Sequence, residues 1–97
     1  MAAIKHRWTL DEDLKCCRMY LECFVLNKSS MDIGQFVSLL EKELPNIQPN
    51  SLKMKVQNIK HILHEKGLKD TLKTAPLANY SQQNLKAMNV ALEEMGL

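Results

Sequence analysis

The sequence is poor in the features that mark membrane, secreted and disulfide-rich proteins. None of its apolar runs approaches the roughly eighteen uninterrupted residues typical of a membrane-spanning helix, and its start, MAAIKHRW, lacks the long apolar core of a signal peptide. Its three cysteines, Cys16, Cys17 and Cys23, are odd in number and lie close together, which does not suggest a disulfide framework. We therefore expect a soluble, cytoplasmic protein.

Groups of residues that carry catalytic or metal chemistry are also missing. The sequence has no glycine-rich phosphate loop, no GxSxG elbow and no histidine pair with an Asn or Asp such as an HNH nuclease centre needs. Its histidines have no CxxC or HxxxH companions, and the side chains of Cys16 and Cys17 diverge by about a hundred degrees on a helix. The sequence thus predicts no enzymatic activity, no catalytic residue, no metal site and no cofactor.

What the sequence does contain is helical periodicity, without a strand pattern or an internal repeat. Thr9 and Glu12 form a capping box that begins a first helix, and its apolar face continues to about Leu26. The acidic side chains of Asp11, Glu12 and Asp13 lie in the first turn, where the helix dipole favours negative charge. We assign these carboxylates a capping role and no catalytic one.

The next two helices are joined by a short link, PNIQPN. Asp32 and Gln35 cap a second helix that ends at the first proline of the link. Asn50 or Ser51 is expected to cap a third helix, which stops at Gly67 as a left-handed C-terminal cap. The seam of this third helix repeats with the helical period and marks a buried face, formed by Leu52, Val56, Ile59 and Leu63.

The remaining chain completes a single all-α domain spanning residues 1–97. We divide it into a basic arm (1–8), a compact three-helix core of the helix-turn-helix kind (9–67), a connector (68–80) and a C-terminal fourth helix (81–97) that Ser81 caps.

Positive charge is concentrated in the second half of the chain. Residues 1–50 carry six Lys or Arg against seven Asp or Glu, whereas residues 51–97 carry seven against four. Most of this charge lies on the third helix and just after it, as expected for a surface that meets nucleic acid.

A second row of side chains on the third helix is displaced by one residue from the apolar seam, and each side chain in it can donate a hydrogen bond. We predict that this row faces a DNA groove, and it consists of Lys53, Gln57, Lys60 and His64. Flanking phosphate contacts are predicted for Lys55, Asn58, His61, Lys66, Lys69 and Lys73, and the arm would be anchored by Lys5 and Arg7. The alternative interpretation of the row is a solvated amphipathic face. His61 and His64 are interpreted as groove-facing or solvent-facing, because we expect no carboxylate at a helical spacing that would hold a tautomer for catalysis.

Two stretches carry a resemblance to known families. The opening, Lys5-His6-Arg7-Trp8-Thr9-Leu10-Asp11-Glu12-Asp13, resembles the start of Myb/SANT-like helical domains. The segments Ser51-Leu52-Lys53-Met54-Lys55-Val56-Gln57-Asn58-Ile59 and Asn79-Tyr80-Ser81 resemble small helical domains at the front of bacterial HNH-type restriction endonucleases. This resemblance implies a DNA-recognition module. Myb-type repeats carry three regularly spaced tryptophans, of which only Trp8 is present here, and SANT relatives can bind proteins instead.

The sequence therefore predicts a DNA-binding module with double-stranded DNA as partner, either the recognition domain of a restriction or HNH-type nuclease or a small regulator. The alternative is a protein-protein interaction module from a phage or mobile element, for example an inhibitor of a host defence protein. Its support is the adaptable packing surface that helical methionines offer, namely Met19, Met54, Met88 and Met95. We expect no membrane partner, and a monomer or a weak homodimer formed through the last helix.

Overall fold

The computed structural model of the chain describes residues 6–97. Within that range the chain forms helices and no strand, which confirms the all-α class. The elements are α1 (Leu10–Leu21), which continues as the π-helical turn η1 (Glu22–Leu26), then α2 (Ile33–Glu43), α3 (Pro49–Glu65) and α4 (Gln82–Glu94). Across residues 6–97, no helix combines the length and the apolar character needed to cross a membrane.

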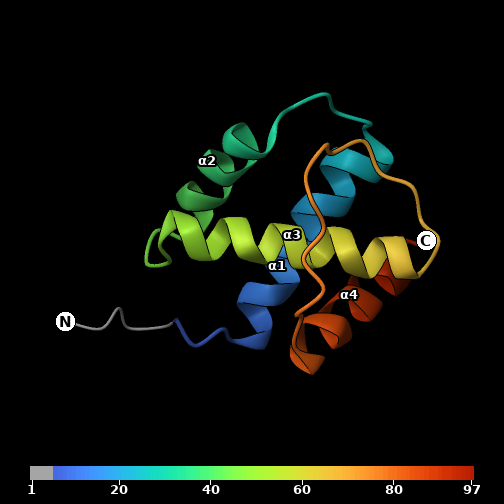
Figure 1. The fold of residues 1–97 in the computed structure, drawn as a ribbon. Coiled ribbons are helices and arrows are strands. Elements are labelled where there is room, and N and C mark those ends of the chain that lie inside the picture. Colours follow the sequence, from blue (N-terminus) through green and yellow to red (C-terminus); the bar gives the residue numbers. More distant parts are fainter. Residues whose placement is uncertain (1–5) are drawn as a thin grey trace.

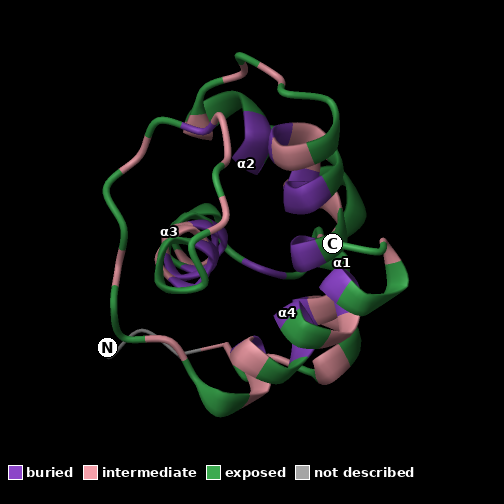
Figure 2. Cartoon of the chain, turned by 90° about the vertical axis from the view of Figure 1, so that its right-hand side faces the viewer, coloured by how far each residue is buried: buried purple, intermediate pink, exposed green. Residues whose placement is uncertain are grey.

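Helix α3 lies at the centre of the molecule. In Figure 1, α1 passes behind it, α2 and α4 lie on opposite sides of it, and the connector of residues 68–80 crosses in front. Figure 2, which looks along α3, shows buried positions on the helices where they face one another. The predicted seam of α3 is confirmed, since Leu52, Val56, Ile59 and Leu63 are all fully buried.

The core is built from two pairs of helices, and α3 joins them because it also contacts α1 and α4. Helix α1 packs along α4, and α2 packs against α3. The rings of Tyr20, Phe24 and Phe36 meet edge to face between α1, η1 and α2, with centroids 4.9 to 5.9 Å apart. Such aromatic contacts add to the stabilisation that the buried area alone provides.

The predicted helix boundaries are confirmed at most positions. Thr9 and Asp32 each complete a capping box, and the Ser81 hydroxyl accepts from a backbone N–H in the first turn of α4. Helix α3 begins earlier than expected, at Pro49 with Gln48 as its N-cap, because proline suits the first position of a helix. Gly67 ends it with φ 73°, a left-handed conformation that costs glycine little.

The connector has no regular structure but is bound tightly to the helices. The carboxylate of Asp70 accepts hydrogen bonds from the Tyr20 hydroxyl at 3.0 Å, from Lys60 Nζ at 2.9 Å and from the backbone N–H of Leu72 at 3.0 Å. Burial raises the pKa of Tyr20, and the neighbouring Asp70 carboxylate raises it further. The hydroxyl therefore keeps its proton and remains a hydrogen-bond donor. The N–H of Thr71 donates to the carbonyl of Phe24 at 2.9 Å. The connector thus joins η1 to α3.

Candidate functional site

The predicted groove-facing row on α3 is not a continuous exposed face, because the connector crosses its middle. Gln57 is half-buried, with its amide 3.5 Å from the Thr74 hydroxyl. Lys60 Nζ donates to Asp70 and, at 2.8 Å, to the carbonyl of Leu72. Lys53 and His64, at the two ends of the row, are exposed. A ligand could therefore reach the side chains at the two ends of the row, whereas the connector partly covers those in the middle.

Two of the predicted phosphate contacts lie in the interior, which contradicts the surface position that we expected for them. Asn58 is 8% exposed and donates its amide to the carbonyl of Leu77 at 2.7 Å. Lys55 is 7% exposed, and its Nζ lies 2.7 Å from an Asp13 carboxylate oxygen. Both side chains are committed to contacts inside the protein, because the helix that carries them is covered by its neighbours on several sides.

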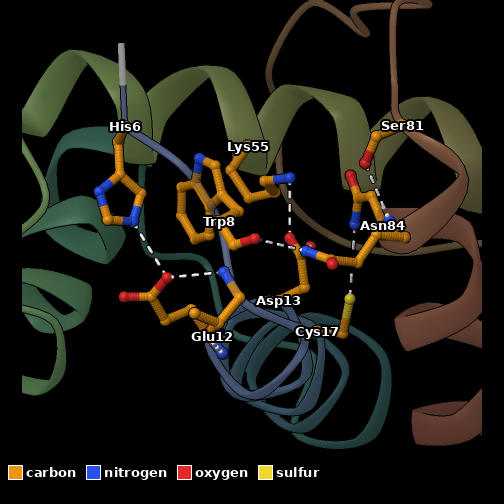
Figure 3. A network of polar contacts seen from close by, with 10 residues as sticks. His6, Trp8, Glu12, Asp13, Cys17, Lys55, Ser81 and Asn84 are labelled. Carbon is orange, nitrogen blue, oxygen red and sulfur yellow. Dashed lines mark hydrogen bonds and ion pairs between the residues drawn. The ribbon is translucent and has the colours of Figure 1, made fainter. Parts of the chain in front are cut away.

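Asp13 is likewise not the surface capping residue that the sequence suggested. It is fully buried, and Figure 3 shows how its carboxylate joins three parts of the chain. Besides the ion pair with Lys55, it accepts a hydrogen bond at 2.8 Å from Gln83 Nε2, which also donates to the carbonyl of Trp8 at 2.7 Å. Lys55 Nζ lies 4.5 Å from the centre of the Trp8 ring, within the range of a cation–π contact. This network ties the arm to α1, α3 and α4.

A second set of contacts holds the arm just before Trp8. His6 Nε2 lies 3.0 Å from a Glu12 carboxylate oxygen that also accepts from the backbone N–H of Thr9. Partial burial raises the pKa of Glu12, but these hydrogen bonds to Thr9 and His6 outweigh it and leave the pKa below its ordinary value. Arg7 is exposed, whereas Lys5 lies outside the described residues.

The histidines of α3 differ from the expectation. Glu65 stands at the i+4 spacing from His61, and its carboxylate lies 3.4 Å from His61 Nε2, so a carboxylate partner is present after all. The His61 ring also lies 6.0 Å from the ring of Tyr80. His64 projects into solvent. The contact between His61 and Glu65 lies at the surface of α3, where the two side chains are 24% and 50% exposed.

The remaining predicted cations are exposed. Lys53, Lys66, Lys69 and Lys73 make no ion pair within residues 6–97. By contrast, Lys15 and Arg18 of α1 are paired with Glu43 and Glu94. Among the described residues, these four lysines of α3 and the connector therefore have no carboxylate partner.

Beside the arm, the first half of α3 borders an open groove of about 600 Å³. It lies between the arm, α3 and the segment that leads into α4. Its walls combine amide, hydroxyl, cationic and apolar side chains, which are those of His6, Arg7, Trp8, Ser51, Met54, Lys55, Asn58, Leu77, Asn79, Ser81 and Gln83. The sequence pointed to part of this set through the arm and the Asn79-Tyr80-Ser81 motif. It gave no signal for Gln83 or Leu77, because these residues meet the groove only through the tertiary fold.

The cysteines are unreactive packing residues at two of their three positions. Burial raises the pKa of Cys16 to about 12, and it also raises the pKa of Cys17. Cys23 is partly exposed. In the part of the chain that the structure describes, no three His, Cys, Asp or Glu side chains lie close enough to hold a metal ion.

Comparison of the chain with protein-family models, with curated protein sequences and with solved structures finds no match in any of the three.

Proposed function

We propose that the chain is a DNA-binding module in which the exposed parts of α3, the connector and the arm contact the duplex. The helices α1, α2 and α3 would act as a helix-turn-helix core of the Myb/SANT-like kind, attached in a bacterial cytoplasm to a restriction or HNH-type nuclease or acting as a small regulator. The observation that carries the proposal is that Lys53, Lys66, Lys69 and Lys73 are exposed and make no ion pair with any residue of 6–97.

The covered middle of α3 limits how the helix can meet DNA. In helix-turn-helix proteins the N-terminal residues of the recognition helix contact base edges. Asn50, Lys53 and Met54 are exposed in the first turns of α3, ahead of the crossing connector. We therefore assign groove contacts to this end. The lysines that follow α3 then serve as phosphate contacts, which position the protein without reading sequence.

A salt titration of binding to duplex DNA tests this proposal. Binding should weaken steeply with salt, and Lys69→Gln should lower the slope of log affinity against log salt by about one unit, because one phosphate contact is lost. Lys86, on α4, is also exposed, so Lys86→Gln is the matched control and should leave the slope unchanged. If the wild-type protein gave no mobility shift with duplex DNA at low salt, the proposal would be wrong.

The second candidate function is protein binding, which the exposed apolar side chains favour. Leu26, Met54 and Leu97 are 50%, 52% and 42% exposed. Of the methionines that supported this alternative, Met88 is buried, and Met19 and Met95 pack against the core, so Met54 is the one available for contact. A partner held through such apolar contacts would bind with little salt dependence, and the same titration therefore separates the two functions.

A further inference from the structure

We propose that the groove beside the arm binds one unpaired nucleotide, with its base against Met54 and Leu77 and its phosphate at Arg7. This inference rests on the proposed function, because it names the part of the nucleic acid that this surface takes.

The size and shape of the groove suit a small ligand. Its volume of about 600 Å³ falls within the range of roughly 300 to 1,000 Å³ found for small-molecule sites. Three separate segments form its walls, so a ligand in it would touch the arm, α3 and the approach to α4 together. A base that remains paired in a duplex is enclosed by its neighbours and cannot enter such a concave site, whereas an extruded or single-stranded base can.

The lining has the chemistry that recognises a nucleobase. Unstacked bases bind against apolar or aromatic side chains and are read through hydrogen bonds to their edges. Met54, Leu77 and Trp8 supply the apolar contacts, and Met54 is 52% exposed. Ser51 and Asn79 add a hydroxyl and an amide on the same groove. Amide and hydroxyl groups can both donate and accept, so together they match the mixed edge of a base.

The charge of the groove matches a single phosphate. Lys55 lines the groove but is neutralised by Asp13, and His6 is held by Glu12. Arg7 is exposed and makes no ion pair within residues 6–97. Its planar guanidinium can hold a phosphate through two hydrogen bonds. The fixed arm keeps this side chain at the rim, because its neighbours His6 and Trp8 are both bound to the helices.

Trp8 provides a direct readout, because it is the only tryptophan of the chain and lines the groove. The 97-residue chain is titrated with four probes: deoxyadenosine 5′-monophosphate, inorganic phosphate, a fully paired duplex, and the same duplex with one extrahelical adenosine. We expect the mononucleotide to change Trp8 emission saturably and inorganic phosphate to leave it unchanged. The duplex with the extrahelical adenosine should bind about tenfold more tightly than the paired duplex, the gain expected from stacking one base.

Variants locate the effect in the groove. Met54→Ala should remove most of the tenfold preference, and Arg7→Gln should weaken mononucleotide binding, while Lys86→Gln should change neither. All three side chains are exposed, so the fold should be preserved.

The outcomes separate this inference from the proposed function. Equal affinity for both duplexes with constant Trp8 emission would overturn the nucleotide site and leave DNA binding intact. An equal response to inorganic phosphate would reduce the groove to an anion site and overturn the inference. Saturable mononucleotide binding without binding of either duplex would support the groove and refute the proposed function.

Discussion

Lys55 illustrates how one residue can change its role between sequence and structure. A buried charge needs a partner, because its removal from water costs several kcal/mol. Lys55 is 7% exposed and Asp13 is fully buried, so each depends on the other. A lysine that the sequence placed at a phosphate thus holds α1 to α3 and covers the Trp8 ring.

We therefore predict that Lys55→Met destabilises the protein by about 3 to 5 kcal/mol, since it leaves the Asp13 charge buried without a partner. The double variant Lys55→Met/Asp13→Leu should recover most of this loss, because well-packed apolar residues can replace a buried ion pair. The free energy of unfolding in urea measures both effects. Lys53→Met, two residues away and exposed, should stay within about 0.5 kcal/mol of the wild type. A loss for Lys55→Met as small as that of Lys53→Met would contradict the buried pair.

At the scale of elements, the connector determines how much of α3 is accessible. Its backbone is irregular, yet Leu72 is buried. Asp70 accepts hydrogen bonds from a side chain of α1, from a side chain of α3 and from a backbone N–H of the connector itself. The carboxylate therefore acts as the junction that holds the connector across α3, where it covers Gln57 and Lys60.

Replacing this junction should release the connector while the helices persist. We predict that Asp70→Asn costs about 3 kcal/mol in the free energy of unfolding, because the Lys60 charge loses its carboxylate in a partly buried site. Amide hydrogen exchange should accelerate by a larger factor in the peptides of residues 68–80 than in α1 and α4, because the connector opens locally as well as with the whole domain. Lys69→Gln, an exposed neighbour, is the control and should change neither quantity. Exchange that accelerates equally over the whole chain would show that the connector is not an independent unit.

The helices could be predicted from local sequence, whereas the parts of their surfaces that other segments cover could not. The capping boxes at Thr9 and Asp32 and the glycine stop at Gly67 depend on residues within a few positions of one another, and the predictions made from them are confirmed. The partial burial of Lys60 depends on Asp70, which lies in an irregular segment without periodicity. A lysine beside an apolar seam looks the same in the sequence whether water or a connector covers it.

A signal for one missed residue was nonetheless present. Asp13 stands four positions before Cys17 and seven before Tyr20, so it continues the stripe that proved to be buried on α1. Its place in the acidic first turn favoured the capping interpretation instead. An acidic residue in register with a buried stripe is a candidate for an internal ion pair, and the lysine partner lies on another helix.

At the scale of the whole molecule, α4 buries its apolar face against the rest of the chain. The sequence left open a weak homodimer through this helix. Ala87, Met88, Ala91 and Leu92 are buried, and α4 packs along α1. Isolated exposed apolar side chains are normal on a monomer and do not by themselves form an interface.

We therefore predict that the protein is a monomer from micromolar to several hundred micromolar concentration. Sedimentation velocity should give the coefficient of one 11.1 kDa chain throughout this range. A coefficient that rises with concentration would contradict the prediction. In that case two variants would locate the contact, because the exposed Leu26 ends η1 and the exposed Leu97 follows α4. Leu97→Ser should abolish self-association through the segment after α4, and Leu26→Ser should abolish self-association through η1. A monomer would leave the exposed apolar side chains of Leu26, Met54 and Leu97 free for another protein, and the exposed lysines of α3 and the connector free for a polyanion.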